Sequence, residues 1–353
     1  MLLEGRAIHE KVLTILSYKE ENIMKRYRVC AWLLGVLCVS YCILSGFQIA
    51  AAPIIMKFSD QVSEDNPHYA ANVYFAERVA EKTNGAIEVK VFPSSQLGDV
   101  RETLEGALIG TVEMTKAAAG SLSSFVPEFS VFSLPYIFTD REQVFAALDG
   151  KVGEILAEKL EQSGFKLIAY YDTGFRSIFN QKRPINSIED MKGLKIRVMN
   201  DPIMIDTINT LSALATPLAY GELYTALQQG VVDGAEQPPV ALYSMKFYEV
   251  AKYFSFTNHF YDLNVVVMGK MFFDKLTPEQ QQAVLEAGQE TQAYERKLWK
   301  EYEDGIIDKL KAEGMEVNTL DLAPFQKAVE AILDQNKDKV GGSDFIETVL
   351  SYR

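Results

Sequence analysis

Two arginines stand in parts of the chain where a charged side chain is costly. Arg197 lies inside the apolar run Leu194–Met199, and Arg176 directly follows the segment Tyr170–Phe175. Alternate residues of a strand share a face, so Arg197 would lie on the face opposite Ile196. A buried guanidinium needs an anionic partner, and its planar fork suits a carboxylate. These residues indicate a carboxylate-binding site, with a structural ion pair to an Asp or Glu of the chain as the alternative.

A third polar segment, Asp233–Pro239, places Glu236 and Gln237 at the end of an expected strand, where two prolines fix the backbone. Such a turn can direct side chains into a cleft, although an ordinary strand-to-helix connection has the same pattern. Lys116 is a further candidate, because it lies in the strand-like segment 112–118 and would need a partner there.

Common enzyme motifs are missing from the sequence. It contains no dinucleotide-binding glycine motif, no phosphate-binding loop and no nucleophile elbow. After residue 52 there are only two histidines, His68 and His259, and no cysteine, so we expect no metal site and no cofactor. These absences favour a binding protein over an enzyme, and an enzyme acting on acidic sugars remains the alternative.

The composition limits the class of protein. The 353 residues are 48% hydrophobic, and 48 acidic against 35 basic side chains give a net charge of −13. This charge argues against nucleic-acid binding, which needs a basic surface. The length suggests two globular domains.

The first 52 residues have the features of a secretory signal. The basic residues Lys25, Arg26 and Arg28 precede the hydrophobic stretch 29–47, and Ala50–Ala52 provide a cleavage site of small residues. We therefore expect export to the periplasm with cleavage near Ala50–Ala52, and an uncleaved membrane anchor is the alternative. Residues 1–23 fit neither interpretation, and Met24 would be a better start. All three cysteines, Cys30, Cys38 and Cys42, lie in this leader.

Behind the leader, strand-like and helix-like segments alternate, which is typical of α/β layers. Asn66-Pro67 is a helix start, with a capping residue and a proline at the first helical position. Apolar residues at helical spacing from Thr277 to about Gly314 predict one helix of roughly 50 Å, which would lie across two lobes. A coiled-coil dimerisation helix is the alternative. The expected strands are Ile54–Phe58, Ile87–Phe92, Leu167–Tyr171, Leu194–Met199 and Val265–Met268.

Two stretches of the chain resemble each other. The stretch from Pro93 to Glu113 and the stretch from Pro217 to Asp233 share one pattern: a Glu, a Gly eight residues later, a Val two residues after the Gly, and an acid directly after the Val. This repeat favours two equivalent lobes, although any unit of helix, glycine and strand could have this form.

Five segments together resemble the solute-binding proteins of tripartite ATP-independent periplasmic (TRAP) transporters of the DctP type. The likeness covers essentially all of the chain after the leader. The segments are VFPSSQLGD at 91–99, VFSLPYIF at 131–138, MKGLKIRV at 191–198, ELYTALQQGVVDGAEQP at 222–238 and KFYEVAKY at 246–253.

The resemblance implies an α/β periplasmic-binding-protein fold of type II, a two-lobed "Venus flytrap" with one long helix spanning both lobes. We expect lobe I to comprise 53–174 and about 262–300, and lobe II 175–261 and about 301–353. The protein is then expected to be a monomer that captures a small organic acid and delivers it to the small and large membrane subunits of a TRAP permease. A related domain feeding a membrane sensor would have the same sequence pattern.

The resemblance also assigns roles to single residues. It implies that Arg197 forms the salt bridge to the ligand carboxylate, that Arg176 is a second cationic contact, and that Tyr220 places a ring beside the ligand. Gln237 stands where the family usually has Asn. Glu236 would contact the ligand, or would orient Arg197 or a neighbouring side chain. The further ligand-binding candidates are Lys116, Asp172, His68 and Asp99. The resemblance also implies that the polar run 60–66 lines the cleft.

The ligand expected from the variants TGFRSIFN and GAEQPP is a sugar acid such as a hexuronate. A C4-dicarboxylate is the alternative, followed by a keto acid or an aromatic acid.

Overall fold

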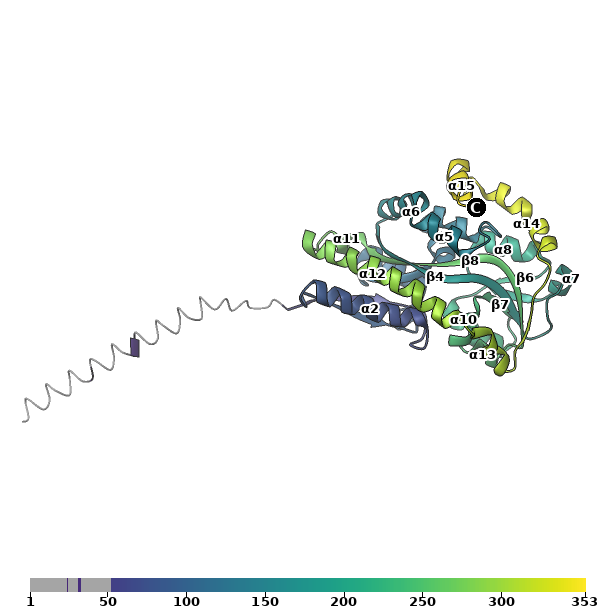
Figure 1. The fold of residues 1–353 in the computed structure, drawn as a ribbon, viewed down its shortest axis with the longest axis horizontal. Helices are drawn as coiled ribbons and strands as arrows, with labels where there is room; N and C mark the ends of the chain where they lie inside the picture. The colour runs from purple at the N-terminus through teal and green to yellow at the C-terminus, as the bar shows by residue number, and fades with distance from the viewer. Residues whose placement is uncertain (1–23, 25–30, 33–51) are drawn as a thin grey trace, which may run out of the picture. The chain divides into compact units, whose positions relative to one another are not determined.

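The computed structural model describes residues 52–353 together with residues 24 and 31–32. Residues 53–353 form one compact unit (Figure 1). The predicted signal peptide, its three cysteines and Ala50–Ala51 of the expected cleavage site lie outside the described residues. Within the described part of the chain, no helix is both long enough and apolar enough to cross a bilayer.

Strands and helices follow one another along this unit from β1 to α15. In chain order they are β1 (Ile54–Ser59), α2 (Pro67–Lys82), β2 (Ile87–Phe92), α3 (Val100–Ile109), β3 (Met114–Ala118), α4 (Ala119–Leu122), η1 (Pro127–Ser133), α5 (Arg141–Leu148), α6 (Lys151–Gln162), β4 (Phe165–Asn180), α7 (Ile188–Met191), β5 (Lys195–Val198), α8 (Pro202–Thr210), β6 (Leu214–Pro217), η2 (Tyr220–Glu222), α9 (Leu223–Gln228), β7 (Gly234–Gln237), α10 (Pro239–Ser244), η3 (Phe247–Glu249), β8 (Tyr253–Gly269), α11 (Lys270–Phe273), α12 (Pro278–Glu303), α13 (Ile306–Ala312), β9 (Glu316–Asn318), α14 (Ala323–Asn336) and α15 (Ser343–Leu350).

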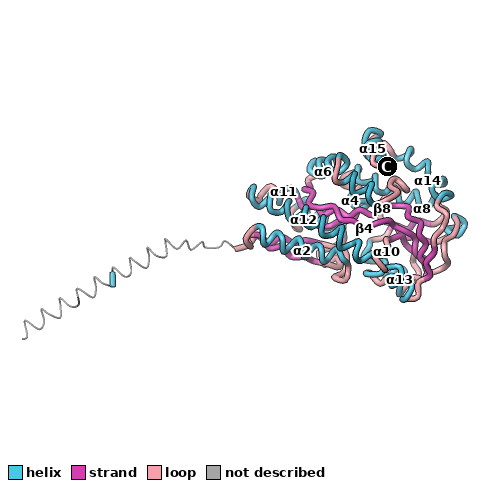
Figure 2. The backbone as a smooth tube through the Cα atoms, viewed as in Figure 1, coloured by secondary structure: helices cyan, strands magenta, loops and turns pink. Residues whose placement is uncertain are grey.

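The described strands form one nine-stranded sheet in the order β2-β1-β3-β8-β4-β7-β5-β6, with β9 paired to β8. On one side β1 pairs in parallel with β2 and β3, and on the other side β5 pairs in parallel with β6 and β7. The antiparallel strands β4 and β8 lie between these two groups, and helices cover the sheet (Figure 2). The expected α/β fold is confirmed.

The strands β4 and β8 are much longer than the sequence predicts. The segments 167–171 and 265–268 are only parts of them. Their pairing shifts register between Asp172 and Phe175, where Gly174 has a φ of 81°. β8 pairs with β3 of the first group through its C-terminal end, and β4 pairs with β7 of the second group through its C-terminal end, so the antiparallel pair connects the two groups. The lobe boundaries expected from the sequence stay a prediction.

The long helix is shorter than the sequence predicts. Its start is as expected, because Thr277 caps it and Pro278 occupies the first turn. It ends at Glu303, where Gly305 adopts a left-handed φ of 76°, and α13 continues as a separate helix. The 26 residues of α12 span about 39 Å. The helix packs on α2 and β4 and also contacts α10 and α13, so it reaches both halves of the sheet (Figure 1).

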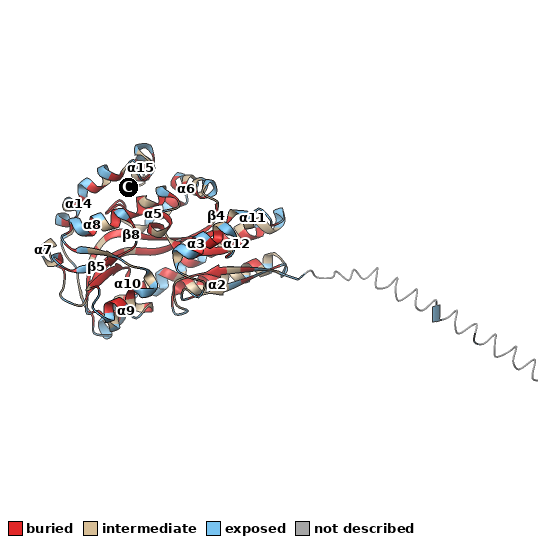
Figure 3. Cartoon of the chain, turned by 180° about the vertical axis from the view of Figure 1, so that it is seen from behind, coloured by how far each residue is buried: buried red, intermediate tan, exposed pale blue. Residues whose placement is uncertain are grey.

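The hydrophobic core lies against both faces of the sheet. The central strands are buried, whereas the outer faces of the helices are exposed (Figure 3). One cluster joins α2 and α12 to the first parallel group, through residues such as Phe58, Phe75 and Val284. Another joins α9 and α10 to β7 of the second group. A further cluster contains Ala117 of β3 together with Ile196 of β5, so the two halves of the sheet share part of their core.

The internal repeat of the sequence recurs in the hydrogen bonding. Glu113 accepts a hydrogen bond from the backbone N–H of Lys57 at 2.8 Å, and Asp233 accepts one from the backbone N–H of Lys195 at 2.9 Å. In both stretches the acid binds the neighbouring parallel strand. The two halves of the sheet thus contain the same local unit.

Candidate functional site

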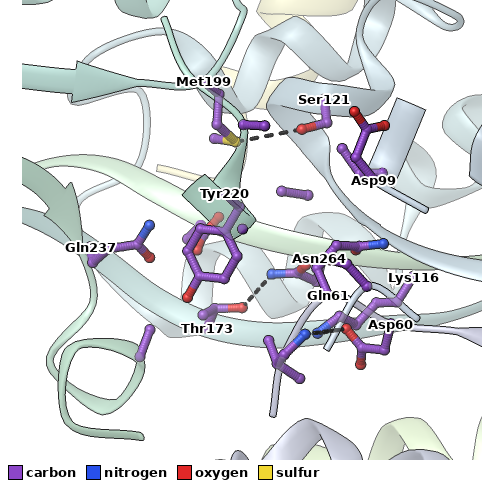
Figure 4. Close-up of a pocket in the computed structure, with 18 of the residues that line it drawn as sticks. Asp60, Gln61, Asp99, Lys116, Ser121, Thr173, Met199, Tyr220, Gln237 and Asn264 are labelled. Carbon is purple, nitrogen blue, oxygen red and sulfur yellow. Dashed lines mark hydrogen bonds and ion pairs between the residues drawn. The ribbon is translucent and has the colours of Figure 1, made fainter. Parts of the chain in front are cut away.

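A cavity of about 350 Å³ opens at the carboxyl ends of the parallel strands. Residues after β1 and β2 and within β3 line it from the first group, and residues of β5 and β7 and after β6 line it from the second. Ligands of open α/β sheets bind at this edge. The volume is near the lower end for small-molecule sites. Figure 4 shows part of the lining, with Tyr220 central and Gln237, Asn264 and Lys116 around it.

Arg197 reaches this cavity from β5. Ile196 and Val198 pack in the core, whereas Arg197 lies on the other face and lines the cavity, as strand alternation predicts. Its Nε donates to the main-chain oxygen of Leu218 at 2.9 Å, and its Nη1 is buried without a partner. No carboxylate of the described residues lies within salt-bridge distance of it. Burial lowers the pKa of Arg197 to about 10, and the neighbouring Arg176 adds to this decrease.

Arg176 also lines the cavity but has two carboxylate partners. Its Nε forms an ion pair with Glu236, its Nη2 donates to the main-chain oxygen of Glu236 at 2.8 Å, and its Nη1 lies 2.8 Å from Asp262. Burial alone would lower the pKa of Arg176, but Asp262 and Glu236 outweigh it and raise this pKa. The structural ion pair that the sequence allowed for either arginine is therefore present at Arg176.

Glu236 lies outside the cavity lining. It is fully buried and pairs with Arg176, a neighbour of Arg197, which is one of the two roles expected for it. Its neighbour Gln237 does line the cavity, because adjacent residues of β7 point to opposite faces. The Gln237 amide makes no hydrogen bond within the described part of the chain, which leaves a donor and an acceptor for a ligand.

Tyr220 follows β6 and places its ring beside Arg197. The guanidinium carbon lies 5.7 Å from the ring centroid, within the range of a cation–π contact. The ring of Phe247 supports it edge to face at 6.1 Å. Burial raises the pKa of the Tyr220 hydroxyl, so it is a neutral group in the cavity.

Lys116 finds the partner that the sequence required. Its Nζ lies 3.0 Å from Asp60 and 2.8 Å from His68 Nδ1. Since the ammonium donates to Nδ1, the His68 proton is on Nε2, which donates to the main-chain oxygen of Asp172 at 3.0 Å and lies 3.1 Å from Glu295. Burial and the charge of Lys116 lower the pKa of His68 well below its usual value, so this histidine is neutral. Lys116 and His68 both line the cavity, and Lys116 is already neutralised.

Asp172 needs a correction, because its side chain is outside the cavity lining. Its carboxylate lies 2.7 Å from Arg141 Nε and accepts hydrogen bonds from the Tyr261 hydroxyl and the Gly174 N–H. Arg141 in turn forms a bidentate pair with Glu303 of α12. Asp172 thus holds the irregular part of β4 in place from outside the cavity lining.

Asp99 lies at the exposed mouth of the cavity. Its side chain caps α3 by accepting from the N–H of Glu102 at 2.9 Å, in a reciprocal capping box. The cap of α3 is therefore sufficient to explain why an acid stands at this position. Because Asp99 also lines the cavity mouth, its side chain would lie near a bound ligand.

The sequence missed several lining residues. Asp60 was noted only as part of a polar run, and Thr173 and Asn264 carry no local pattern that marks them, because they lie within the long strands β4 and β8. Trp299 of α12 touches the cavity at the far side of His68, with the two rings 4.5 Å apart. Gln61 and Asn66 of the expected polar run also line the cavity, and the other missed polar residues of the lining are Ser95, Arg101, Ser121, Ser124, Asn200 and Asp262.

The described residues contain no cluster of His, Cys, Asp or Glu that could hold a metal ion. The cavity instead offers one unpaired guanidinium, paired charges and neutral hydroxyl and amide groups.

The chain is similar to known solute-binding proteins over most of its length. Residues 58–339 match the family model of the bacterial extracellular solute-binding proteins, family 7. The 2,3-diketo-L-gulonate-binding periplasmic protein YiaO of Escherichia coli K12 is 35% identical over 297 residues, which are 83% of this chain and 90% of that protein.

Two solved structures of TRAP periplasmic solute-binding proteins show the same fold. The protein of Sulfurospirillum deleyianum, with bound succinate, is 34% identical with a TM-score of 0.82, covering 86% of this chain and 100% of that one. The protein of a Sulfitobacter species, with bound β-D-galacturonate, is 36% identical with a TM-score of 0.80, covering 84% and 99%. The family match, the identities and the shared fold together place the chain in the DctP family, and it is a periplasmic TRAP solute-binding protein that binds an organic acid and is not an enzyme.

Proposed function

We propose that this protein captures a sugar acid with one carboxylate, such as a hexuronate, and delivers it to a TRAP membrane permease. The single observation that carries the proposal is Arg197, a buried guanidinium that lines the cavity and has no carboxylate partner among the described residues. A buried cation without a partner is costly, so an anionic ligand is favoured at this point.

The other cations of the cavity favour one carboxylate over two. Lys116 is paired with Asp60, and Arg176 is paired with Glu236 and Asp262. Arg101 lies at the mouth, where it is exposed and pairs with Glu105. A second carboxylate of the ligand would therefore find no unpaired buried cation along the described lining.

The remaining polar lining suits hydroxyl groups. Asn264 donates to Thr173 at 2.8 Å, and both side chains face the cavity, as does the free amide of Gln237 (Figure 4). Neutral amides and hydroxyls both donate and accept hydrogen bonds, so they match the hydroxyls of a sugar acid. A purely apolar acid would leave these groups without partners.

The relatives support the same class of ligand. One relative is named for binding 2,3-diketo-L-gulonate and one solved structure holds β-D-galacturonate, and both of these are acids derived from sugars. A C4-dicarboxylate is the second candidate, because the solved structure from Sulfurospirillum deleyianum holds succinate.

Ligand capture would proceed by closure of the two lobes, with lobe I at 53–174 and about 262–300 and lobe II at the remainder of the unit. Asn66 donates to Ser244 at 2.9 Å, and this hydrogen bond joins the segment after β1 to α10 of the other half. A ligand that contacts both halves favours the closed state. The closed monomer would then be recognised by the permease subunits, after export by the predicted signal peptide.

The test is a thermal-shift panel on the purified protein with D-galacturonate, D-glucuronate, D-gluconate, succinate and L-malate. A ligand at a hundred times its Kd stabilises the folded state by about 2.7 kcal/mol. We expect a clear increase in melting temperature with at least one sugar acid. An increase with succinate or malate and none with any sugar acid would show that the proposal is wrong and that the dicarboxylate alternative is right.

A further inference from the structure

Asp262 is an acid inside a cavity that we expect to bind an acid. It lies on β8 and is 5% exposed, and it shares the face of the strand with Asn264, two residues further on. Its Oδ2 pairs with Arg176 Nη1 at 2.8 Å, whereas its Oδ1 accepts no hydrogen bond from any residue that the structure describes. One oxygen of this carboxylate thus remains for a ligand.

The need to neutralise the charge of Arg176 does not explain why an acid stands at position 262. Glu236 already forms an ion pair with Arg176 from outside the cavity, and it is completely buried. One carboxylate would balance one guanidinium. The second carboxylate lies on the cavity side of Arg176, so its negative charge acts on whatever occupies the cavity.

We propose that Asp262 is a specificity-determining residue of the site. Its Oδ1 accepts a hydrogen bond from a hydroxyl of the bound acid, while its Oδ2 keeps Arg176 Nη1 away from any second carboxylate of a ligand. The inference rests on the proposed binding of a hydroxylated monocarboxylate. A hydroxyl can donate to Asp262, whereas a second carboxylate cannot donate and is repelled.

The experiment compares two acids of equal carbon number, D-erythronate and succinate, by calorimetric titration of the wild-type protein and the Asp262→Asn variant. The variant removes the charge and keeps the shape, so the positive charge of Arg176 is no longer balanced on the cavity side. We expect the affinity for succinate to increase relative to that for D-erythronate by at least about tenfold, which is about 1.4 kcal/mol. An Asp262→Asn variant with no gain for succinate overturns the inference.

Glu236→Gln is the charge-matched control, because it removes a carboxylate from the same arginine outside the cavity. It should change both affinities in the same direction and leave their ratio within about twofold. A shift of the ratio as large as that of Asp262→Asn would mean that only the total charge matters, and the role assigned to Asp262 would be wrong.

A second variant keeps the inference testable if Asp262→Asn does not fold. Asn264→Asp adds a carboxylate on the same face of β8 without touching the Arg176 pairs. It should weaken succinate binding more than D-erythronate binding, and equal weakening would contradict the repulsion argument. Failure of the proposed function would appear in the wild-type protein, which would then bind succinate more tightly than D-erythronate. The inference about Asp262 is judged instead by how the ratio of the two affinities changes between wild type and variant.

Discussion

Arg176 and Arg197 are equally buried, each 2% exposed, but only Arg176 has carboxylate partners among the described residues. Glu236 and Asp262 raise the pKa of Arg176, whereas burial lowers the pKa of Arg197 to about 10. Arg197 is still charged at neutral pH, so the folded protein holds a cation whose anionic partner must come from outside.

Replacing Arg197 by Gln should abolish ligand binding without harming the fold. Losing one partner of a buried charge pair typically costs about 2–5 kcal/mol, so the Kd should increase at least about thirtyfold. The ligand-free variant should melt at the wild-type temperature or higher, because an unpaired buried charge has been removed. Calorimetric titration and thermal unfolding measure the two effects. Collapse of the ligand-free protein would instead identify Arg197 as a structural residue.

Arg176→Gln should have the opposite pattern. Removing this guanidinium leaves Glu236 and Asp262 buried without their cation, which typically costs about 3–5 kcal/mol of the free energy of unfolding. Urea denaturation of the ligand-free protein measures this loss. A variant that keeps wild-type stability and loses only ligand binding would contradict the pairing of Arg176 with these two acids.

The contrast between the two arginines could not be predicted from local sequence. Both follow or occupy apolar strands, and the deciding carboxylates come from Glu236 and Asp262, far along the chain. Alternation within β5 did predict the face on which Arg197 lies, since that depends only on neighbouring residues. The same limit explains why the ion pair of Asp172 was not predicted, because its partner Arg141 lies on α5, a separate element.

The full lengths of β4 and β8 were not predicted from the sequence for a related reason. Polar residues that serve the cavity and the bend, such as Thr173, Asp262 and Asn264, interrupt the apolar pattern of β4 and β8. Only the apolar ends of these strands have the pattern of a buried strand. Short strands without such residues, like β2, were predicted with the observed bounds.

Glu295 should make stability depend on pH. Burial and the charge of Asp172 raise the pKa of Glu295 well above its usual 4.5. The folded state therefore keeps a proton that the unfolded chain loses above about pH 4.5, and this contribution to stability is lost as pH increases through the raised pKa. Glu295→Gln imitates the protonated form, so it should equal wild type at acidic pH and exceed it at higher pH in urea denaturation.

Glu290 on the same helix gives the matched control. Lys82 and Arg78 lower its pKa, so its ionised form contributes stability that is lost on acidification. Glu290→Gln should be less stable than wild type at neutral pH, and the difference should shrink as pH falls. Two glutamate variants with the same pH trend would contradict the assignment of Glu295 as a protonated group.

Trp299 should report ligand binding by its fluorescence. It lines the cavity, its ring lies 4.5 Å from that of His68, and Trp32 is the other tryptophan of the sequence. Occupation of the cavity changes the polarity around the indole, so emission should shift on titration with a binding acid. Trp32 belongs to the leader that we expect to be cleaved, so Trp299→Phe should remove the response of the exported protein. A response that survives in Trp299→Phe would contradict the placement of Trp299.

The hydrogen bond from Asn66 to Ser244 should slow ligand release. It links the segment after β1 to α10, and both Asn66 and Ala241 of α10 line the cavity. Breaking one such bond typically costs about 0.5–1.5 kcal/mol, so Ser244→Ala should speed dissociation about two- to tenfold, with little change in association. Stopped-flow fluorescence of Trp299 measures both rates.

Asn66 also caps α2, by accepting from the His68 N–H at 2.9 Å. Asn66→Ala loses both the cap and the donor, so it should speed dissociation like Ser244→Ala and in addition lose about 1 kcal/mol of stability without ligand. Unchanged dissociation in Ser244→Ala would mean that this contact does not hold the closed state.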